Sequence, residues 1–370
     1  GLTAGGRWGW AGCAGLHRGP RCRGFGVGCG GRERAGCAVS HDEWVSLDTF
    51  VPRPSRPVRG RDSPALTVRL ASEYTGLSGV RPERDDAWHR VASGVYVPAG
   101  EWRQATADNR HLALVDAAAR KHGGGSGELV LAGVSAALVL GLPVVGRLPE
   151  LVQCLGREGQ RRRTSLLQRR VRQEPVVILA GSYHVTDVAT TCVDLARWGG
   201  LVQGVCAMDH ALRNRLCTRE ELDVVLARLS ASARGLAAAR IAVRLADPLS
   251  ESPGESLSRV RMWQARVPRP VLQYEIRTEI GLVRTDYFWP ETVVKPHPIS
   301  EFDGEAKYHR ETHGCATEET LVRERRRERA LWRLGYPMAR WTWADAWYNS
   351  GARMLAELAA VGVRPGTARW

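Results

Sequence analysis

The chain has 370 residues and a formal net charge of +14 at pH 7, and 44% of its residues are hydrophobic. This length and composition predict two or three globular domains with real cores, which argues against a wholly disordered or fibrous protein. No run of about 18 apolar residues is present and the start lacks a basic region followed by an apolar one, so neither a transmembrane helix nor a signal peptide is expected.

The positive charge favours polyanionic partners such as DNA, because basic side chains neutralise phosphates and release counterions. A GC-rich genome also produces an arginine-heavy composition, so charge alone leaves both explanations open. The nine cysteines include no CxxC pair, which is typical of reduced thiols and argues against a disulfide framework or a zinc site. We therefore expect a cytoplasmic protein with no membrane partner, and the oligomeric state stays undetermined.

Residues 1–62 differ from the rest of the chain in composition. They are rich in Gly, Arg and Cys, lack a sustained period, and end in the proline-rich run of residues 51–57. Such a segment cannot bury enough apolar surface to fold alone. We expect a disordered tail or an over-extended start; a basic arm on nucleic acid is the alternative.

Residues 63–150 predict a winged-helix-like region. Residues 66–71 favour a short helix, and residues 88–98 alternate like a strand pair that turns at Ser93-Gly94. A helix followed by a β-hairpin is the way a winged helix ends. Residues 107–122 and 130–140 then predict two further helices, the second one stopped by Gly141-Leu142-Pro143.

Residues 151–250 predict a helical middle region. Two β-rich runs, residues 165–167 and 176–180, precede a helical pattern that begins near Thr186. Thr218 with Glu221 three residues later is a capping box, which predicts the start of another helix. No constellation of chemical groups stands out in this region.

Residues 251–350 predict the element order α-β-β-β-α-β, and residues 351–370 a C-terminal tail. A helix opens at Ser252-Pro253-Gly254-Glu255, and alternating residues then indicate strands over 272–276 and 282–289. A third strand-like segment ends in Glu301-Phe302-Asp303-Gly304. A basic helix and the strand-like residues 339–343 follow.

Acidic side chains on these strands predict a metal site. If the strands pair as a meander, Asp286, Glu301 and Asp303 can converge, and two or three carboxylates are the usual protein share of a Mg²⁺ site. Such a metal would polarise a phosphodiester and activate water, and Lys307 could stabilise charge at the phosphate. Non-catalytic explanations stay open, because Glu255 can cap its helix, Asp286 can pair with an arginine, and Asp303-Gly304 can be turn chemistry.

Several motifs occur in a distinctive order along the chain. Towards the N-terminus they are residues 89–98, residues 135–138 with 141–143, and residues 190–197; towards the C-terminus they are Pro253-Gly254-Glu255-Ser256, residues 285–291, residues 301–304 with Lys307-Tyr308, and residues 334–336 before 340–343. Their order resembles a family of uncharacterised actinobacterial proteins. The C-terminal part of that family is similar to the PD-(D/E)XK nuclease superfamily near the very-short-patch repair endonucleases, and its N-terminal part resembles the AbiEi-type antitoxin of type IV toxin–antitoxin systems.

The resemblance implies a role for each acid. Asp286 would be the first acid of the nuclease motif, Glu301 the second, and Glu255 the acid of the leading helix. Asp303 stands where the motif prefers lysine, a departure that this branch shares. The segment before Glu301 is lengthened by Lys295-Pro296-His297-Pro298. Its two prolines lack the backbone N–H groups that donate hydrogen bonds between strands.

Two functions follow as expectations. The first is a DNA-interacting protein whose nuclease-like domain hydrolyses phosphodiesters with Mg²⁺, with Glu255, Asp286, Glu301, Asp303 and Lys307 as catalytic residues and Asp286, Glu301 and Asp303 as metal ligands. The second is a non-enzymatic DNA-binding regulator or antitoxin with a toxin partner, in which the nuclease-like fold is only a scaffold.

Overall fold

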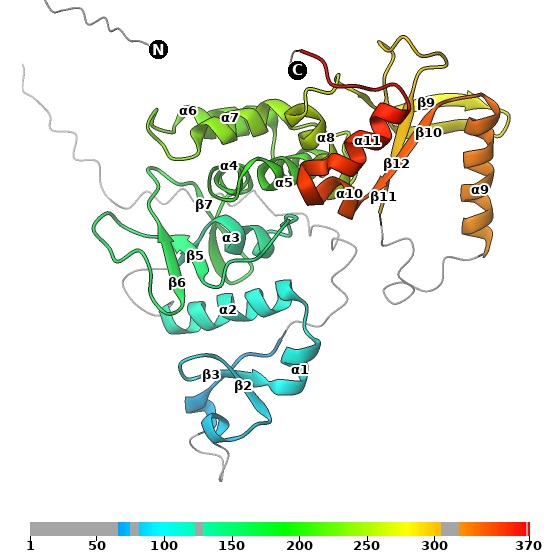
Figure 1. Ribbon diagram of the computed structural model, residues 1–370. Coiled ribbons are helices and arrows are strands. Elements are labelled where there is room, and N and C mark those ends of the chain that lie inside the picture. The colour runs from blue at the N-terminus through cyan, green and yellow to red at the C-terminus, as the bar shows by residue number, and fades with distance from the viewer. Residues whose placement is uncertain (1–65, 75–80, 123–128, 305–317, 368) are drawn as a thin grey trace, which may run out of the picture. The chain divides into compact units, whose positions relative to one another are not determined.

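Helices and strands alternate along the computed structural model of the chain (Figure 1), which describes residues 66–74, 81–122, 129–304, 318–367 and 369–370. The predicted α/β fold class is confirmed, with strands gathered into three sheets within these ranges. The predicted tail of residues 1–62 lies outside the described residues. In the part of the chain that is described, no helix is both long and apolar enough to cross a membrane.

A small sheet of order β1-β3-β2 comes first, and its hairpin is as predicted, with Gly94 at φ +72° making the turn. The predicted helix over residues 66–71 is wrong: buried Val68 and exposed Arg69 alternate, and Arg69 pairs with Tyr96 as strand β1. The helix-then-hairpin order of a winged helix is therefore not found in residues 66–74 and 81–98. The elements are β1 Arg69–Leu70, 3₁₀ turns Ala71–Tyr74 and Pro82–Arg84, β2 Trp88–Ala92, β3 Val95–Pro98, α1 Ala99–Gln104 and α2 Ala107–His122.

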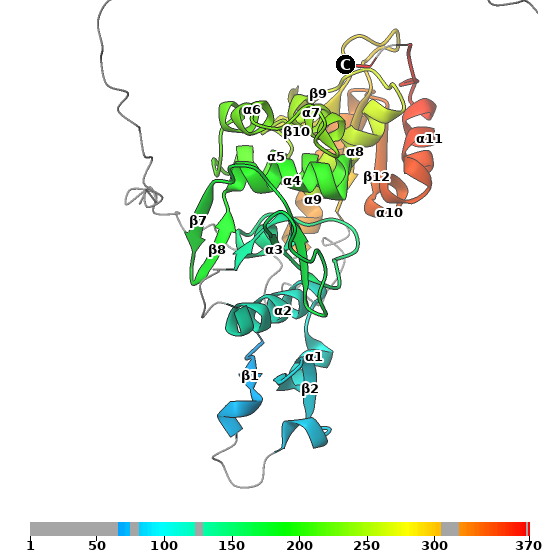
Figure 2. The ribbon, with the colours of Figure 1, turned by 90° about the vertical axis from the view of Figure 1, so that its left-hand side faces the viewer.

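The second sheet has the order β6-β5-β4-β8-β7 and crosses the predicted boundary at residue 150. Leu131 on one side of that boundary and Val152 and Val185 on the other are buried in one cluster. Residues 151–250 are therefore not a helical region throughout, since their first third consists of strands, including the antiparallel pair β7–β8 seen in Figure 2. The elements are β4 Val130–Leu131, α3 Gly133–Val139, β5 Val152–Leu155, β6 Leu167–Arg170, β7 Val177–Ala180 and β8 Tyr183–Thr186.

Four helices follow, and their starts are set by local chemistry. Asp187, one residue after the predicted cap, accepts the backbone N–H of Thr190 at 2.8 Å and begins the first of them. The predicted capping box of Thr218 and Glu221 is present. The helices are α4 Val188–Gly199, α5 Leu201–Arg213, α6 Arg219–Ala227 and α7 Leu236–Leu245, and their apolar faces form the largest buried cluster of the described residues.

The third sheet contains the elements that sequence analysis assigned to the chemistry, in the predicted order α-β-β-β-α-β. Strands β9, β10 and β11 form an antiparallel meander, and β12 lies parallel to β11, so the sheet order is β12-β11-β10-β9. The elements are α8 Pro253–Gln264, β9 Val271–Thr278, β10 Gly281–Phe288, β11 Ile299–Asp303, α9 Glu318–Arg333 and β12 Met338–Thr342.

Two helices cover the faces of this sheet. Helix α8 packs through Leu257 into the cluster that contains Tyr287 and Trp341, and the indole N–H of Trp341 donates to Ser258 of α8 at 2.8 Å. Helix α9, which runs beside β10 and β9 in Figure 1, contributes Leu331 to the cluster on the other face. The orientation of α8 decides where Glu255 lies relative to the strands.

Residues 351–370, predicted as a tail, instead contribute to the core. The missed signal is the i, i+4 spacing of Met354 and Leu358, which places both side chains on one helix face. Both are fully buried in the cluster of the third sheet, with Val363 beside them. The last elements are α10 Trp343–Trp347, a 3₁₀ turn Tyr348–Gly351 and α11 Ala352–Ala360.

Candidate active site around Glu255 and Asp286

Helix α8 presents Glu255 from its first turn, and Glu255 is only 7% exposed. Ser252 caps the helix, with the N–H of Glu255 donating to its Oγ at 3.2 Å. In return the Glu255 carboxylate accepts the Ser252 hydroxyl at 2.8 Å and the backbone N–H of Glu251 at 2.9 Å. The capping role expected from the sequence is therefore present, and it holds the carboxylate of Glu255 in a fixed position.

Strand β10 brings Asp286 to the same place, and the side chain of Gln273 from β9 lies between the two acids. The Gln273 amide nitrogen donates to Glu255 Oε2 at 3.1 Å and makes a longer contact with Asp286 Oδ1 at 3.5 Å. The other oxygen of Asp286 accepts the backbone N–H of Phe302 at 2.8 Å. Gln273 has φ +52°, a left-handed conformation that residues other than glycine rarely adopt.

The two carboxylates are close enough to influence one another's ionisation. Burial, together with the negative charge of Asp286, raises the pKa of Glu255 to about 7. Glu255 is therefore close to half protonated at neutral pH. A carboxyl group with a pKa in this range can both hold and release a proton under physiological conditions.

Glu301, the expected second acid, is bound by two arginines. Arg327 of α9 contacts its Oε1, and Arg340 of β12 donates to its Oε2 at 2.9 Å. The Glu301 side chain is only 5% exposed, so these arginines neutralise a buried charge. Arg327 also donates to the carbonyl of Arg284 on β10 at 2.6 Å, which ties α9 to the strand that carries Asp286.

The remaining expected residues are not gathered into the same group. Asp303 is partly buried opposite Thr342 of β12, and no hydrogen bond or ion pair joins its side chain to another described residue. Lys307 lies outside the described residues. Among the residues that are described, no three His, Cys, Asp or Glu side chains are arranged to hold a metal ion. The structure links Asp286 to Glu255, therefore, and does not gather Asp286, Glu301 and Asp303 into one metal-binding group.

Two arginines lie beside the acidic pair, both bound to Glu251. Glu251 precedes the N-cap residue of α8. Its Oε1 accepts a hydrogen bond from Arg213 at 2.7 Å and another from Arg284 at 2.9 Å. Both arginines remain substantially exposed, so their charges face solvent beside the site. Sequence reasoning missed Gln273, Arg327 and Arg340 as parts of this site. Gln273 gives no signal, because a neutral amide in a half-buried strand is common. Arg327 lies in the segment that the sequence predicts as a basic helix.

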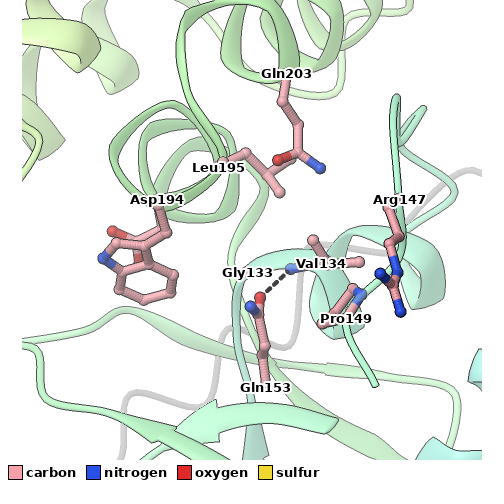
Figure 3. Close-up of a pocket in the computed structure, with 10 residues that line it drawn as sticks. Gly133, Val134, Arg147, Pro149, Gln153, Asp194, Leu195 and Gln203 are labelled. Atoms are coloured by element: carbon pink, nitrogen blue, oxygen red, sulfur yellow. Dashed lines mark hydrogen bonds between the residues drawn. The ribbon is translucent and has the colours of Figure 1, made fainter. Parts of the chain in front are cut away.

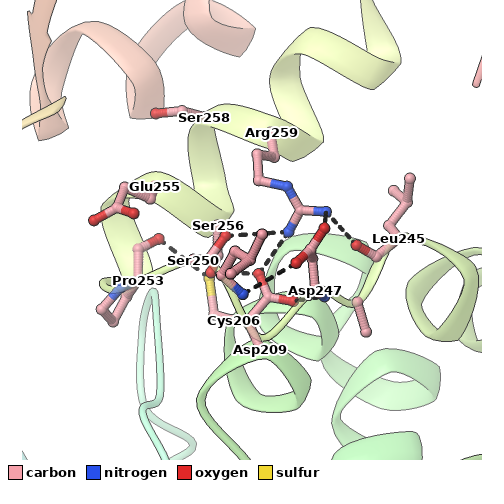
Figure 4. Close-up of polar contacts among 12 residues, drawn as sticks. Cys206, Asp209, Leu245, Asp247, Ser250, Pro253, Glu255, Ser256, Ser258 and Arg259 are labelled. Atoms are coloured by element: carbon pink, nitrogen blue, oxygen red, sulfur yellow. Dashed lines mark hydrogen bonds and ion pairs between the residues drawn. The ribbon is translucent and has the colours of Figure 1, made fainter. Parts of the chain in front are cut away.

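A buried ion pair holds α8 against α5. Arg259 of α8 donates to Asp209 of α5 at 2.8 Å, and both side chains are at most 3% exposed. Asp209 also accepts the hydroxyl of Ser256 at 2.7 Å and the backbone N–H of Asp247 at 2.7 Å. Figure 4 shows this network on one side of α8, with the Glu255 carboxylate pointing away from it. The helical region therefore helps to position the acid.

The comparisons with known proteins leave the family open. No family model matches the chain, and no solved structure matches it. Two uncharacterised proteins, from two strains of Mycobacterium tuberculosis, are each 36% identical over 107 residues, which is 29% of this chain. The matched segment spans 39% of the length of each relative.

Proposed function

We propose that this chain is a DNA-interacting protein of the cytoplasm whose residues 251–350 form a PD-(D/E)XK-like unit that hydrolyses phosphodiesters. The observation that carries this proposal is the carboxylate pair of Glu255 and Asp286, joined through Gln273 at a sheet of the order expected for such a unit. The exposed Arg213 and Arg284 beside the pair supply positive charge for a phosphate backbone.

The donor chemistry of the pair fits Mg²⁺. Mg²⁺ prefers oxygen ligands and is usually bound through one or two carboxylates, with waters and substrate phosphates completing its shell. Glu255 and Asp286 would hold it, so Asp286 is the one expected ligand that keeps this role. A bound Mg²⁺ would polarise the scissile phosphate and lower the pKa of an attacking water.

The residues of the chain have separate parts in this proposal. Gln273 orients both carboxylates through its amide, and the backbone N–H of Phe302 fixes Asp286. Glu255, whose pKa of about 7 belongs to the metal-free chain, would release its proton on binding the ion and act as a ligand. Glu301 holds Arg327 and Arg340 in place and is a positioning residue.

Replacing Asp286 by alanine is expected to lower Mg²⁺-dependent nicking of supercoiled DNA by at least about 100-fold, because one of two carboxylate ligands is removed. The measurement is the rate of plasmid relaxation by the purified full chain with Mg²⁺ and with EDTA. Glu279→Ala, in the turn between β9 and β10, is the matched control, since within the described part of the chain Glu279 forms a single, exposed ion pair, with Arg333. Equal rates for wild type and Asp286→Ala would rule out this active site.

A second candidate function is a DNA-binding regulator or antitoxin, with a toxin as partner and no catalysis. The observation that favours it is Glu301, whose two carboxylate oxygens are bound by Arg327 and Arg340. An acid neutralised in this way is a poor ligand for a metal, and the nuclease-like unit would then be a scaffold.

In the second case the full chain is expected to bind DNA tightly with affinity unaltered by Asp286→Ala, because Asp286 would not touch the nucleic acid. The logarithm of the binding constant should fall by about 0.9 per phosphate contact for each tenfold rise in salt concentration. Fluorescence anisotropy on labelled duplexes at several salt concentrations measures both properties. Binding that is absent, or insensitive to salt, argues against this candidate.

A further inference from the structure

A cavity of about 150 Å³ lies between the second sheet and helices α4 and α5, far in sequence from the acidic pair. Its walls include Val134, Pro149, Leu195 and the indole of Trp198, with the carboxamides of Gln153 and Gln203 across the opening. Figure 3 shows the Gln203 carboxamide pointing from α5 towards Val134 and Gln153. An engineered apolar cavity of about 150 Å³ holds benzene, so this space accommodates a ring.

The two carboxamides differ in how they are satisfied. Gln153 accepts the backbone N–H of Val134 at 2.8 Å and donates to Gln168 at 3.2 Å. Gln203 is equally buried, at 7% exposure, yet its side chain has no hydrogen-bond partner among the described residues. The Gln203 amide atoms are not among the described side-chain atoms that are both fully buried and unpartnered, so solvent in the cavity reaches them. Gln203 therefore presents one donor and one acceptor edge to a ligand that enters the cavity.

The aromatic wall is held rigidly. Arg170 and Arg197 lie over the Trp198 ring at 5.2 and 5.6 Å, and Arg197 is fixed by the buried Asp194 at 2.8 Å. A side chain at Gly133 would lie 3.1 Å from the same ring, so glycine lets the indole approach the backbone. The ring is therefore in position before any ligand arrives, which lowers the entropic cost of binding.

A basic side chain lines the same cavity. Arg147 is 85% exposed, and among the described residues it pairs with Glu150 alone, which is 76% exposed. An exposed pair of this kind contributes little and exchanges readily for a stronger anion. A phosphate on a ligand seated in the cavity would find its charge partner in Arg147.

We propose that this cavity binds a nucleotide. The base lies against Trp198 and its donor–acceptor edge meets Gln203, as glutamine pairs with base edges elsewhere; Arg147 takes the phosphate. The same chemistry is offered by a free mononucleotide and by an unpaired base of single-stranded DNA. This site is independent of the acidic pair and of the hydrolysis proposed for it.

Gln203→Met, which keeps the shape of the side chain and removes its amide, is expected to weaken nucleotide binding by about 10- to 100-fold. Isothermal titration calorimetry of the full chain measures it with the four nucleoside monophosphates, their nucleosides, and a single-stranded 9-mer with or without a central abasic site. Arg147→Gln should weaken the binding of the monophosphates, which carry a phosphate, and leave the binding of the nucleosides unchanged. Gln264→Met, which alters an exposed glutamine bonded to Arg261, is the control.

The results distinguish a free mononucleotide from an unpaired base of single-stranded DNA. Binding of monophosphates that Gln203→Met weakens identifies a free nucleotide, and binding of only the intact 9-mer identifies a base within a strand. Thermal unfolding checks that each variant folds; if Gln203→Met does not, Gln203→Asn, which withdraws the amide by one methylene, should give the same loss. Absence of binding to the wild type, or equal affinities for wild type and variant, overturns the proposal and leaves a cavity that holds water.

Discussion

Replacing Asp209 by alanine is expected to lower the free energy of unfolding by about 3–5 kcal/mol, the cost of leaving a buried charge without its partner. Arg259 would keep its positive charge at 3% exposure. Its remaining partners would be the hydroxyl of Ser250 at 3.2 Å, the carbonyl of Leu245 and the carboxylate of Asp247 at 4.0 Å, a longer ion pair than the one lost. Ser256 and the backbone N–H of Asp247 would lose their acceptor as well.

Urea denaturation followed by far-UV circular dichroism measures this loss. Glu279→Ala is the matched control, because its pair with Arg333 is exposed and should change stability by less than about 1 kcal/mol. The double variant Asp209→Ala with Arg259→Met should recover much of the loss, since the uncompensated charge is then gone. A change below 1 kcal/mol in Asp209→Ala would mean that the network does not hold α8.

This network also joins residues 251–350 to the helices that precede them. Asp209 belongs to α5 and Arg259 to α8, so their bond crosses the boundary that sequence analysis placed at residue 250. The pattern of apolar residues reports local elements, whereas a buried ion pair between residues 50 positions apart depends on the folded chain. Removing residues before 251 would expose Arg259 and free the first turn of α8, which carries Glu255.

Local patterns predicted the elements of the third sheet well. Alternating residues identified the strand that carries Asp286, the segment that ends in Glu301-Phe302-Asp303 was predicted as strand-like, and Ser252 with Glu255 identified the start of α8. These signals depend on neighbours within a few positions. The predicted convergence of Asp286, Glu301 and Asp303 is not found in the structure. Convergence depends on the direction in which each side chain points from its strand, which local patterns do not report. At Gln273 the left-handed backbone places an amide between Glu255 and Asp286.

The partners of Glu301 also could not be predicted from local patterns, because they lie far from it in the sequence. Arg327 and Arg340 lie 26 and 39 positions further along the chain, and no sequence pattern pairs them with this acid.

The second sheet escaped prediction for a related reason. Its strand β4 has two residues, Val130 and Leu131, which pair in parallel with β8 more than 50 positions away. Such short strands form only because partners distant in sequence supply their hydrogen bonds.

The free energy of unfolding is expected to fall by about 2–3 kcal/mol between pH 5 and pH 8 on account of Glu255 alone. Burial and the charge of Asp286 raise the pKa of this carboxyl from 4.5 to about 7 in the folded chain. Between these two values the folded state binds more protons than the unfolded state, so stability is lost as the pH rises. Glu255→Gln removes the titrating group and should abolish this loss.

Comparison of wild type with Glu255→Gln isolates the effect. Burial lowers the pKa of His111 to about 4, which acts in the opposite direction by lowering stability as the pH falls below its unfolded value near 6.5. His111 is present in both proteins, so its contribution cancels in the difference. Urea midpoints at half-unit steps of pH give the two curves. A constant difference from pH 5 to pH 8 would contradict the raised pKa of Glu255.

Mg²⁺ then distinguishes the two candidate functions. If Glu255 and Asp286 bind the ion, Mg²⁺ displaces the proton from Glu255 and stabilises the folded chain at pH 8, by about 1.4 kcal/mol at ten times its dissociation constant. Glu255→Gln and Asp286→Asn should lose this response, while Glu279→Ala keeps it. A scaffold without a metal site retains the pH dependence, which arises from burial and the neighbouring charge, but gains no stability from Mg²⁺. The two measurements together therefore test the electrostatics of the pair separately from its use as a metal ligand.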